Sequence, residues 1–434
     1  MRQYKAYPAY KDSGVEWIGL VPEHWKIAQI KRISVLNPKK STLSEEKDSL
    51  CTFLPMEKLR TNTVTLDETR PIHEVYGGYS YFCDDDILIA KVTPCFENGN
   101  IAVANGLVNG IGFGSTEINV LRVNEKGHNR FLYYRLQEEQ FRTIAKSEMR
   151  GTGGLKRVPT ELFESFTIGL PDTDEQASIA ATLDRETARI DALVEKKTRF
   201  IELLKEKRQA LITHAVTKGL DPNVKMKDSG VEWIGEVPEH WEVKPFFALV
   251  TELNRKNVGL VETNILSLSY GNIIQKPETR NMGLTPESYE TYQIVESGEI
   301  VFRFTDLQND KRSLRSAQVT QRGIITSAYM AVKPQSIDST YFAWLMRSYD
   351  LCKVFYAMGG GLRQSLKFED VRRLPVLIPP VDEQSAITNT INAGTARIDA
   401  LVEKTEQSIT LLKERRAAFI TAAVTGQIDL RGKQ

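Results

Sequence analysis

Side chains that can hydrogen-bond base edges or neutralise phosphate gather in several stretches of the sequence. The richest stretch is TDLQNDKRSLRSAQ at residues 305–318. Arginine pairs with guanine, asparagine and glutamine pair with adenine, and lysine and arginine also contact phosphate. A solvated polar loop is the alternative for any single residue, but the cluster as a group favours contact with nucleic acid.

Further candidates surround two glycine-rich stretches, RGTGGLKRV at 150–158 and GGGLRQSLKFEDV at 359–371. RGTGGLK resembles a phosphate cradle but lacks the P-loop spacing GxxxxGK, so it predicts a tight turn near a backbone and no nucleotide hydrolysis. The predicted DNA-binding residues are Lys91, Thr93, Asn98, Asn100, Arg150, Lys156, Arg157, Arg303, Gln308, Asn309, Lys311, Arg312, Arg315, Arg363, Gln364 and Lys367.

Catalytic and metal-binding motifs are absent from the sequence. It contains no GxSxG nucleophile elbow, no HExxH and no GxGxxG. His24 and His240 belong to a repeated PEHW phrase, which favours packing or hydrogen bonding over acid–base chemistry. The acidic run 84–86 suggests metal ligands, but a turn before a strand explains it better. We expect no catalytic residue and no metal site, so any methylation or cleavage would belong to another polypeptide.

Composition describes an ordinary globular protein. The 434 residues predict two or three domains, and 41% hydrophobic with 26% charged residues gives no sign of disorder. A net charge of +1 is no global signature of a nucleic-acid binder, so a basic surface must be local or supplied by partners. The four cysteines form no CxxC pair, and no apolar run is long enough to cross a membrane. A cytoplasmic location is expected.

The chain repeats itself. KDSGVEWIGLVPEHW at 11–25 returns at 227–241 with one substitution, Leu20 against Glu236. PDTDEQASI at 171–179 returns as PPVDEQSAI, and TARIDALVEK at 187–196 returns unchanged at 395–404. Between the repeated phrases lie two blocks that barely resemble each other. A residue that is identical in both copies cannot distinguish two different targets, so the repeated phrases mark a frame, whose tryptophans we expect to pack where block meets helix.

The later repeated phrases begin a long helix in each copy, with Asp174 and Asp382 as candidate caps and Gly219 and Gly426 as stop signals. Some forty residues would make a rod of roughly 60 Å. Pairing of the two copies within one chain is favoured over pairing between chains. Arg208 and Arg416 either set the register or, as we prefer, extend outward. The predicted coiled-coil seam comprises Leu183, Ile190, Val194, Ile201, Leu204, Leu211, Ile391, Ile398, Val402, Ile409, Leu412 and Phe419.

The variable blocks mix short strands, turns and a later helix. In the first we expect a turn and strand at 81–94, a hairpin at 97–106, a strand at 115–123 and a helix at 129–146. In the second, strands at 295–308 and 325–334 precede a helix at 339–358. The predicted fold class is therefore α/β (α+β). Two variable blocks that differ in sequence but are flanked by the same repeated phrases are typical of two different recognition surfaces on one scaffold.

The order of these phrases resembles the specificity (S) subunits of type I restriction-modification systems. The resemblance rests on DSGVEWIGxVPEHW before each block, on DDILIAKVTP and GEIVFRFTD, and on the glycine turn followed by DEQ and TARIDALVEK. It covers essentially the whole chain. It implies a non-catalytic subunit in which two target recognition domains each read half of a bipartite, asymmetric DNA sequence, while paired antiparallel helices set the spacer.

The resemblance also implies partners and cofactors. Two modification subunits would form an adenine N6-methyltransferase that uses S-adenosylmethionine, and two ATP-dependent restriction subunits with Mg would cleave double-stranded DNA. This chain itself would hold no cofactor. Two alternatives stay open: a specificity subunit that serves a fused nuclease-methyltransferase, and a repeat-built scaffold that binds no DNA.

The resemblance suggests a division of the chain into seven parts. These are a conserved N-terminal segment (1–25), a first target recognition domain (26–172), a central long helix (173–217), a linker with the repeated phrase (218–241), a second target recognition domain (242–380), a C-terminal long helix (381–425) and a tail (426–434).

Overall fold

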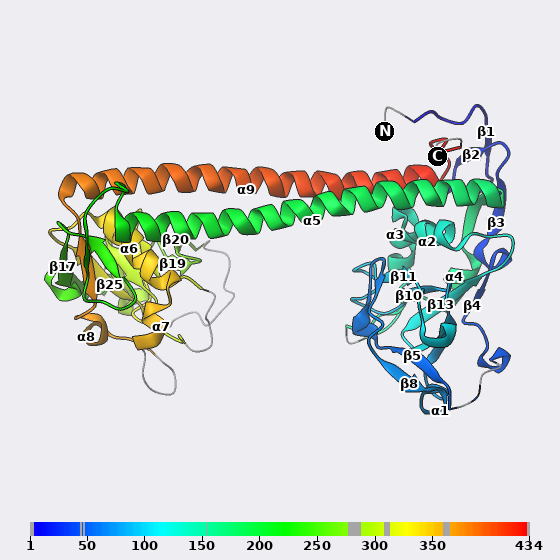
Figure 1. Ribbon diagram of the computed structural model, residues 1–434, viewed down its shortest axis with the longest axis horizontal. Helices are drawn as coiled ribbons and strands as arrows, with labels where there is room; N and C mark the ends of the chain where they lie inside the picture. The colour runs from blue at the N-terminus through cyan, green and yellow to red at the C-terminus, as the bar shows by residue number, and fades with distance from the viewer. Residues whose placement is uncertain are drawn as a thin grey trace. The chain divides into compact units, whose positions relative to one another are not determined.

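The computed structural model describes residues 4–43, 46, 48–152, 154–276, 288–307, 313–358 and 365–431. Contacts divide the chain into two compact units (Figure 1). The first joins Met1–Lys197 with Gln407–Gln434, and the second is Thr198–Glu406. Each unit therefore contains one variable block together with part of both long helices.

The two long helices are α5 (Thr173–Lys218) and α9 (Val381–Val424). Helix α5 is capped by Asp172, whose side chain accepts a hydrogen bond of 2.9 Å from the Glu175 N–H, and not by Asp174, which lies in the first turn. Gly219 and Gly426 follow the helix ends with φ of 75° and 76°. This left-handed conformation suits glycine, so the predicted stop signals are confirmed.

The ends of α5 and α9 pack against each other within each unit. In the second unit, Arg208 of α5 pairs with Asp399 of α9 at 3.0 Å, and Leu211 packs over Gly394, so the helices run antiparallel. In the first unit Arg416 pairs with Asp191 at 2.9 Å. Asp191 and Asp399 occupy the same position of TARIDALVEK. These arginines therefore pair across the helices, contrary to our preference for outward extension.

The predicted seam residues face the interior. All twelve are buried or half-buried, and seven have an exposed fraction of 8% or less: Leu183, Ile190, Ile201, Leu204, Ile391, Ile398 and Phe419. The intervening charged positions of both helices are mostly exposed. A seven-residue apolar repeat keeps the same face toward a partner helix, which explains why the sequence pattern was sufficient here. The expected fold class, mixed α/β with long paired helices, is confirmed.

The first variable block is built on two four-stranded sheets, in the orders β11-β10-β13-β4 and β8-β5-β12-β9. The pairs β14-β3 and β6-β7 complete it, and the repeated phrase before it forms the pair β1-β2. The strands are β1 (Tyr10–Asp12), β2 (Leu20–Pro22), β3 (Lys26–Gln29), β4 (Ser34–Leu36), β5 (Leu50–Leu54), β6 (Leu59–Arg60), β7 (Thr63–Val64), β8 (Thr69–Pro71), β9 (Ser80–Cys83), β10 (Ile87–Ala90), β11 (Ile101–Val103), β12 (Ile111–Gly114), β13 (Ile118–Val123) and β14 (Thr167–Leu170). The helices are α1 (Ile72–Val75), α2 (Asn129–Gln137), α3 (Glu139–Ser147) and α4 (Thr160–Ser165).

The second block repeats the central sheet with different residues, in the order β23-β22-β25-β18. Its pairs β15-β16 and β17-β26 correspond to β1-β2 and β3-β14. The strands are β15 (Met226–Asp228), β16 (Glu236–Pro238), β17 (Glu242–Pro245), β18 (Val250–Leu253), β19 (Leu266–Ser269), β20 (Asn272–Gln275), β21 (Gln293–Val295), β22 (Ile300–Phe302), β23 (Ser316–Gln318), β24 (Gly323–Ile325), β25 (Met330–Pro334) and β26 (Pro375–Ile378). The helices are α6 (Ser339–Leu351), α7 (Val354–Met358) and α8 (Phe368–Val371).

Several expected elements are corrected by the structure. Residues 97–106 form no hairpin of their own, because β11 pairs with β10 across the loop 91–100. The expected helix 129–146 breaks at Glu138, whose extended backbone ends α2 and whose carboxylate caps α3. The expected helix 339–358 breaks at Lys353, which has a φ of 61°. The first break is fixed by the capping side chain of Glu138 and the second by the left-handed backbone of Lys353. Neither feature interrupts the apolar periodicity of the sequence, so the sequence predicted one continuous helix in each case.

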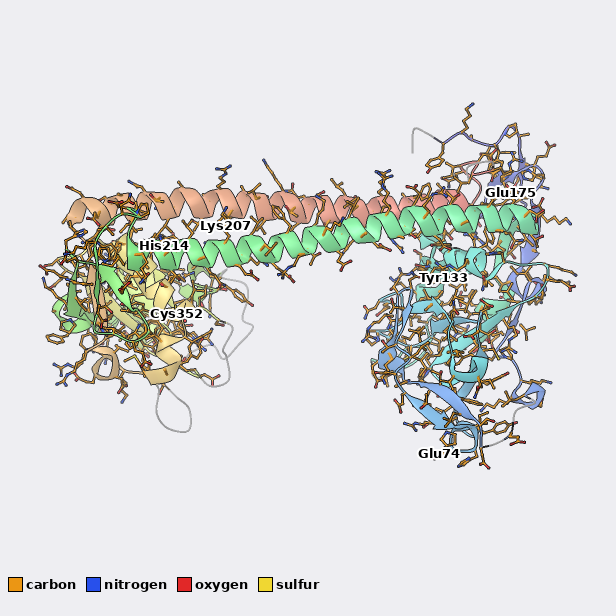
Figure 2. All side chains as sticks on the ribbon, viewed as in Figure 1. Glu74, Tyr133, Glu175, Lys207, His214 and Cys352 are labelled. Carbon is orange, nitrogen blue, oxygen red and sulfur yellow. The ribbon has the colours of Figure 1, made fainter. Side chains whose placement is uncertain are left out.

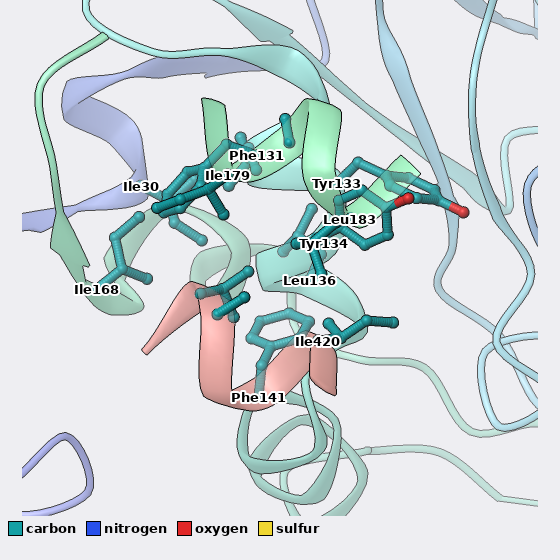
Figure 3. Packing of buried hydrophobic residues seen from close by; sticks show 14 of the residues in the cluster. Ile30, Phe131, Tyr133, Tyr134, Leu136, Phe141, Ile168, Ile179, Leu183 and Ile420 are labelled. Atoms are coloured by element: carbon teal, nitrogen blue, oxygen red, sulfur yellow. The ribbon is translucent and has the colours of Figure 1, made fainter. Parts of the chain in front are cut away.

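The core of the first unit joins the sheet, helices α2 and α3, and the ends of both long helices. Figure 3 shows Ile179 and Leu183 of α5 and Ile420 of α9 packed with Phe131, Tyr134 and Leu136 of α2 and Phe141 of α3. Trp25 also lies in this core and is fully buried, as is Trp241 in the core of the second unit. Among the described residues, no helix has the length and apolar character needed to cross a membrane.

Candidate nucleic-acid interface

In the first unit, the loop 91–100 after β10 lies beside the glycine-rich segment 150–157. The Val158 N–H donates to the Lys91 carbonyl at 2.8 Å, and the Thr93 N–H donates to the Lys156 carbonyl at 2.9 Å. The backbones of Arg150 and Arg157 also pair. The structure therefore brings together two groups of predicted residues that lie about sixty positions apart in sequence. The first group is Lys91 and Thr93, and the second is Arg150, Lys156 and Arg157.

These five residues differ in what they offer a ligand. Thr93 is 9% exposed, and its hydroxyl donates to the Gly154 carbonyl at 2.8 Å, so it holds the turn in place. Arg150 and Lys156 are exposed. Arg157 forms a two-pronged ion pair with Glu117 at 2.6 and 2.9 Å, and this hydrogen bonding lowers the pKa of Glu117. A phosphate would compete with Glu117 for Arg157.

Asn98 and Asn100 line an open hollow of about 840 Å³ in the same loop. Met56, Arg60 and Thr61 form its other side. Asn98 is exposed, whereas Asn100 is 5% exposed. Sequence reasoning missed Arg60 and Thr61, because Arg60 ends β6 and Thr61 begins the turn to β7, and no sequence signal connects this hairpin with residues 98–100.

The second unit repeats the contact between loop and glycine-rich segment. The Leu366 N–H donates to the Phe304 carbonyl at 3.0 Å, just after β22. Arg303 and Lys367 therefore lie beside the same junction as Lys91 and Lys156 in the first unit. Lys367 is exposed and Arg303 is half-buried.

Arg315 is not a surface residue. It is fully buried, and its guanidinium donates to the Thr305 carbonyl at 3.1 Å and to the Tyr356 hydroxyl at 3.1 Å. Arg315 was predicted to contact DNA, but its place in the structure does not match this prediction. Its guanidinium donates to the backbone of the loop after β22 from the protein interior. The other predicted residues of this block lie outside the described residues: Gln308, Asn309, Lys311, Arg312, Arg363 and Gln364.

A buried carboxylate lies behind Arg315. Asp350 accepts a hydrogen bond from the Arg315 N–H and is fully buried, and this burial raises its pKa to about 6. The folded state therefore binds this proton more tightly than the unfolded chain does. Stability from this group is lost as the pH rises from about 4 to about 6, by up to roughly 3 kcal/mol.

Asp350→Asn is expected to remove this pH dependence. An amide cannot ionise, so the unfolding midpoint of the variant should change less between pH 4.5 and pH 6.5 than that of the wild-type chain. Thermal unfolding followed by circular dichroism at both values measures the difference. Parallel pH curves for the two proteins would contradict the assignment of the raised pKa to Asp350.

The repeated phrases form a different kind of site. In the first unit, the Glu175 carboxylate near the start of α5 (Figure 2) accepts from the Tyr7 hydroxyl at 2.7 Å and from the Trp25 indole at 3.2 Å, and it pairs with His24 at 2.7 Å. In the second unit, Glu383 pairs with His240 at 2.5 Å and accepts from the Trp241 indole at 2.9 Å. The predicted hydrogen-bonding role of both histidines is confirmed.

The repeated phrases also present partly exposed tryptophans. Trp17 and Trp233 are 42% and 47% exposed. Trp17 stacks on Phe166 at 6.1 Å, and Trp233 meets Tyr349 edge-on at 6.4 Å. The expectation that these residues pack against the blocks therefore holds in part, because each ring contacts an aromatic residue of its block but remains more than two-fifths exposed.

The acidic run 84–86 forms the turn before β10, as expected. Asp86 is 2% exposed and accepts hydrogen bonds of 2.8 and 2.6 Å from Arg122, while Asp84 accepts one of 3.0 Å from the Leu107 N–H. Across the residues that the structure describes, no group of three or more His, Cys, Asp or Glu side chains is arranged to hold a metal ion.

Comparison with known proteins agrees with this architecture. Residues 22–203 match the family model of the type I restriction modification DNA specificity domain. The specificity subunit of the type I restriction enzyme EcoEI of Escherichia coli is 32% identical over 38% of this chain and 28% of its own length. The chain thus aligns with little more than a quarter of that relative. A specificity subunit from Methanocaldococcus jannaschii, of the putative type I restriction enzyme MjaX, is 21% identical over 95% of this chain and 96% of its own length.

Solved structures show the same fold. The HsdS subunit from Thermoanaerobacter tengcongensis covers 94% of this chain and 98% of its own, with a TM-score of 0.55 and 15% identity. A chain from a type I R-M system, solved in a study of complex assembly, covers 95% and 99% with a TM-score of 0.66 and 14% identity. The resemblance to type I restriction-modification specificity subunits seen in the sequence is confirmed: residues 22–203 match their DNA specificity domain, and the fold is that of an HsdS subunit over most of the chain.

Proposed function

We propose that the chain reads a bipartite, asymmetric sequence in double-stranded DNA and directs adenine N6 methylation and cleavage by partner subunits. Residues 26–172 and 242–380 act as the two target recognition domains, and the paired helices α5 and α9 set the unread spacer. Two modification subunits supply the methyltransferase and two restriction subunits supply ATP-dependent cleavage, in the cytoplasm. S-adenosylmethionine, ATP and Mg bind to the partners.

One observation carries this proposal. In both units the residues just after the central strand, β10 or β22, are hydrogen-bonded to residues that follow a glycine-rich stretch, Lys156 and Val158 in the first unit and Leu366 in the second. The backbone frame is the same, but the side chains on the loops differ between units. Two different half-sites need two different sets of base contacts, whereas two copies of one partner need the same frame.

The exposed basic residues of the first glycine-rich segment fit a phosphate-contacting role. These are Arg150 and Lys156, whereas Asn98 and Asn100 of the loop 91–100 line the open hollow. Phosphate contacts position a protein on DNA, whereas amides and guanidiniums in the grooves can read bases. We therefore assign positioning to Arg150 and Lys156, and base reading to the loop 91–100.

A block exchange tests the proposal. Replacing residues 26–170 with the first block of another specificity subunit is expected to change one half of the methylated sequence and to leave the other half and the spacer unchanged. Mapping methylated adenines in the DNA of cells that express the chain with its modification subunit measures both halves at once. The reciprocal exchange of residues 242–378 is the matched control and should change the other half. A change in both halves, or in neither, would overturn the modular assignment.

A further inference from the structure

The two copies of the frame differ at one place beside the repeated glutamate. In the first unit, the ring of Tyr7 is 4% exposed and lies 5.6 Å from the His24 ring and 5.9 Å from the Trp25 ring, centre to centre. Its hydroxyl donates to Glu175 at 2.7 Å. Burial and this hydrogen bond raise the pKa of Tyr7, so the phenol stays protonated and acts as the donor.

The second unit has the same frame without the tyrosine. The Glu23 N–H donates to the Ala9 carbonyl at 3.0 Å in the first unit, and the Glu239 N–H donates to the Lys225 carbonyl at 2.7 Å in the second. This shared bond fixes the register, and two residues before Lys225 stands Asn223, which is exposed. Asn223 therefore stands where the first copy has Tyr7, and among the described residues no aromatic side chain apart from His240 lines the corresponding cavity.

A cavity of about 250 Å³ occupies the corresponding position. Its walls include Gly219, Val224, Pro238, His240, Glu383 and Ile387. For comparison, a cavity of about 150 Å³ in the core of an engineered lysozyme holds benzene. The space is therefore large enough for one aromatic side chain.

The chemistry of the cavity matches a phenol. Its walls are mainly apolar, and their polar residues are Lys218, Asp221, His240 and Glu383, of which the Glu383 carboxylate is the counterpart of the acceptor Glu175. The Glu383 side chain is 40% exposed, whereas that of Glu175 is 4% exposed, and the difference corresponds to the place that the Tyr7 ring covers in the first copy. Tyrosine joins an apolar ring to one donor, so a mainly apolar cavity with a carboxylate acceptor suits it.

We propose that this cavity binds a tyrosine side chain presented by the modification subunit, in the way that Glu175 and its neighbours hold Tyr7. The identity of the partner rests on the proposed function, whereas the chemistry of the cavity does not. Since Tyr7 already fills the first copy, one chain has one such site, and two identical partners would use the rest of the frame in the same way but differ at this one contact.

Binding of a tyrosine analogue tests the chemistry on the full chain. The probe is N-acetyl-L-tyrosinamide, and N-acetyl-L-phenylalaninamide is its matched control. The Trp241 indole donates to Glu383 at 2.9 Å and is one of five tryptophans, so its N–H signal in a ¹H–¹⁵N spectrum reports on the site. We expect the tyrosine probe to shift this signal with a Kd in the millimolar range and the phenylalanine probe to bind about tenfold more weakly, since it lacks the donor. An unshifted Trp241 signal, or equal binding of both probes, would overturn the proposal.

Variants that fill the cavity provide the second test. Asn223→Tyr supplies in the same chain the residue that the first copy has, so it should abolish probe binding, while Asn223→Ala should bind the probe as the wild type does. Ala386→Phe, at an exposed position on the rim, closes the cavity independently if Asn223→Tyr does not fold. Undiminished probe binding in a folded filling variant would contradict the assignment.

The partner is tested with the modification subunit itself. Asn223→Tyr and Ala386→Phe should weaken its binding at least tenfold in calorimetric titration, a loss of about 1.4 kcal/mol, while Asn223→Ala should not. Unchanged affinity of both filling variants would overturn the choice of partner. Adenine methylation by the wild-type complex is measured in parallel. Loss of methylation would contradict the proposed function, whereas an unshifted Trp241 signal would contradict the cavity assignment.

Discussion

Glu175→Ala is expected to lower the free energy of unfolding of the first unit by roughly 3 kcal/mol. The Glu175 side chain is 4% exposed, and it accepts hydrogen bonds from the Tyr7 hydroxyl and the Trp25 indole and pairs with His24. Removing the carboxylate leaves the buried Tyr7 hydroxyl and Trp25 indole without this acceptor, and each then carries its desolvation cost. Urea unfolding of the full chain followed by circular dichroism measures the loss.

The second copy supplies the matched control. Glu383 has the same position in the DEQ phrase and pairs with His240 and Trp241, but its side chain is 40% exposed. Water can replace much of the hydrogen bonding that the Glu383 carboxylate provides, so Glu383→Ala should lower the free energy of unfolding by about 1 kcal/mol or less. In Glu175→Gln the amide oxygen remains an acceptor, and the variant should recover part of the loss. Equal losses for the two alanine variants would show that burial of Glu175 is not what makes its contacts strong.

The frame was predictable because it depends on sequence patterns that occur in both copies of the repeat. Gly219 and Gly426 end the helices, and the seam residues around Leu183 and Ile391 keep one face of each helix apolar. Periodicity and glycine signals act within a few turns of helix, so they can be read from one sequence. The role of Glu175 was not predicted, because it depends on Tyr7 and Trp25, which reach it only through the fold.

The candidate interface was predictable only in part. The clustering of Lys91 with Lys156 follows from a backbone contact after β10, and the glycine-rich turn was the signal that pointed to it. Arg315 shows the opposite outcome. Its side chain has the chemistry of a base reader, yet it faces inward and donates to loop carbonyls. Side-chain type alone does not reveal whether such a residue faces inward, because Arg315 lies just before β23, which is only three residues long and gives no alternating pattern to read.

Inserting seven residues into each long helix is expected to lengthen the unread spacer by about three base pairs. A heptad adds about 10 Å of helix, and each base pair of DNA occupies about 3.4 Å. The insertions belong after Thr198 in α5 and after Glu406 in α9, between the Arg208–Asp399 and Arg416–Asp191 bridges. Because a heptad rotates a helix by only about 20° from its former phase, the apolar seam is preserved. Mapping of methylated adenines measures the new spacer.

The controls separate length from disruption. A heptad in α5 alone would place Arg208 out of step with Asp399, or Asp191 out of step with Arg416, because antiparallel helices keep both bridges only when both lengthen together. That variant should lose stable pairing and methylation. Two residues inserted in both helices would rotate each apolar stripe by about 200°, away from the partner helix, and this variant should also fail. Methylation at the original spacing by a folded double-heptad variant would mean that the helices do not set the spacer, since both would be longer while the DNA spacing stayed the same.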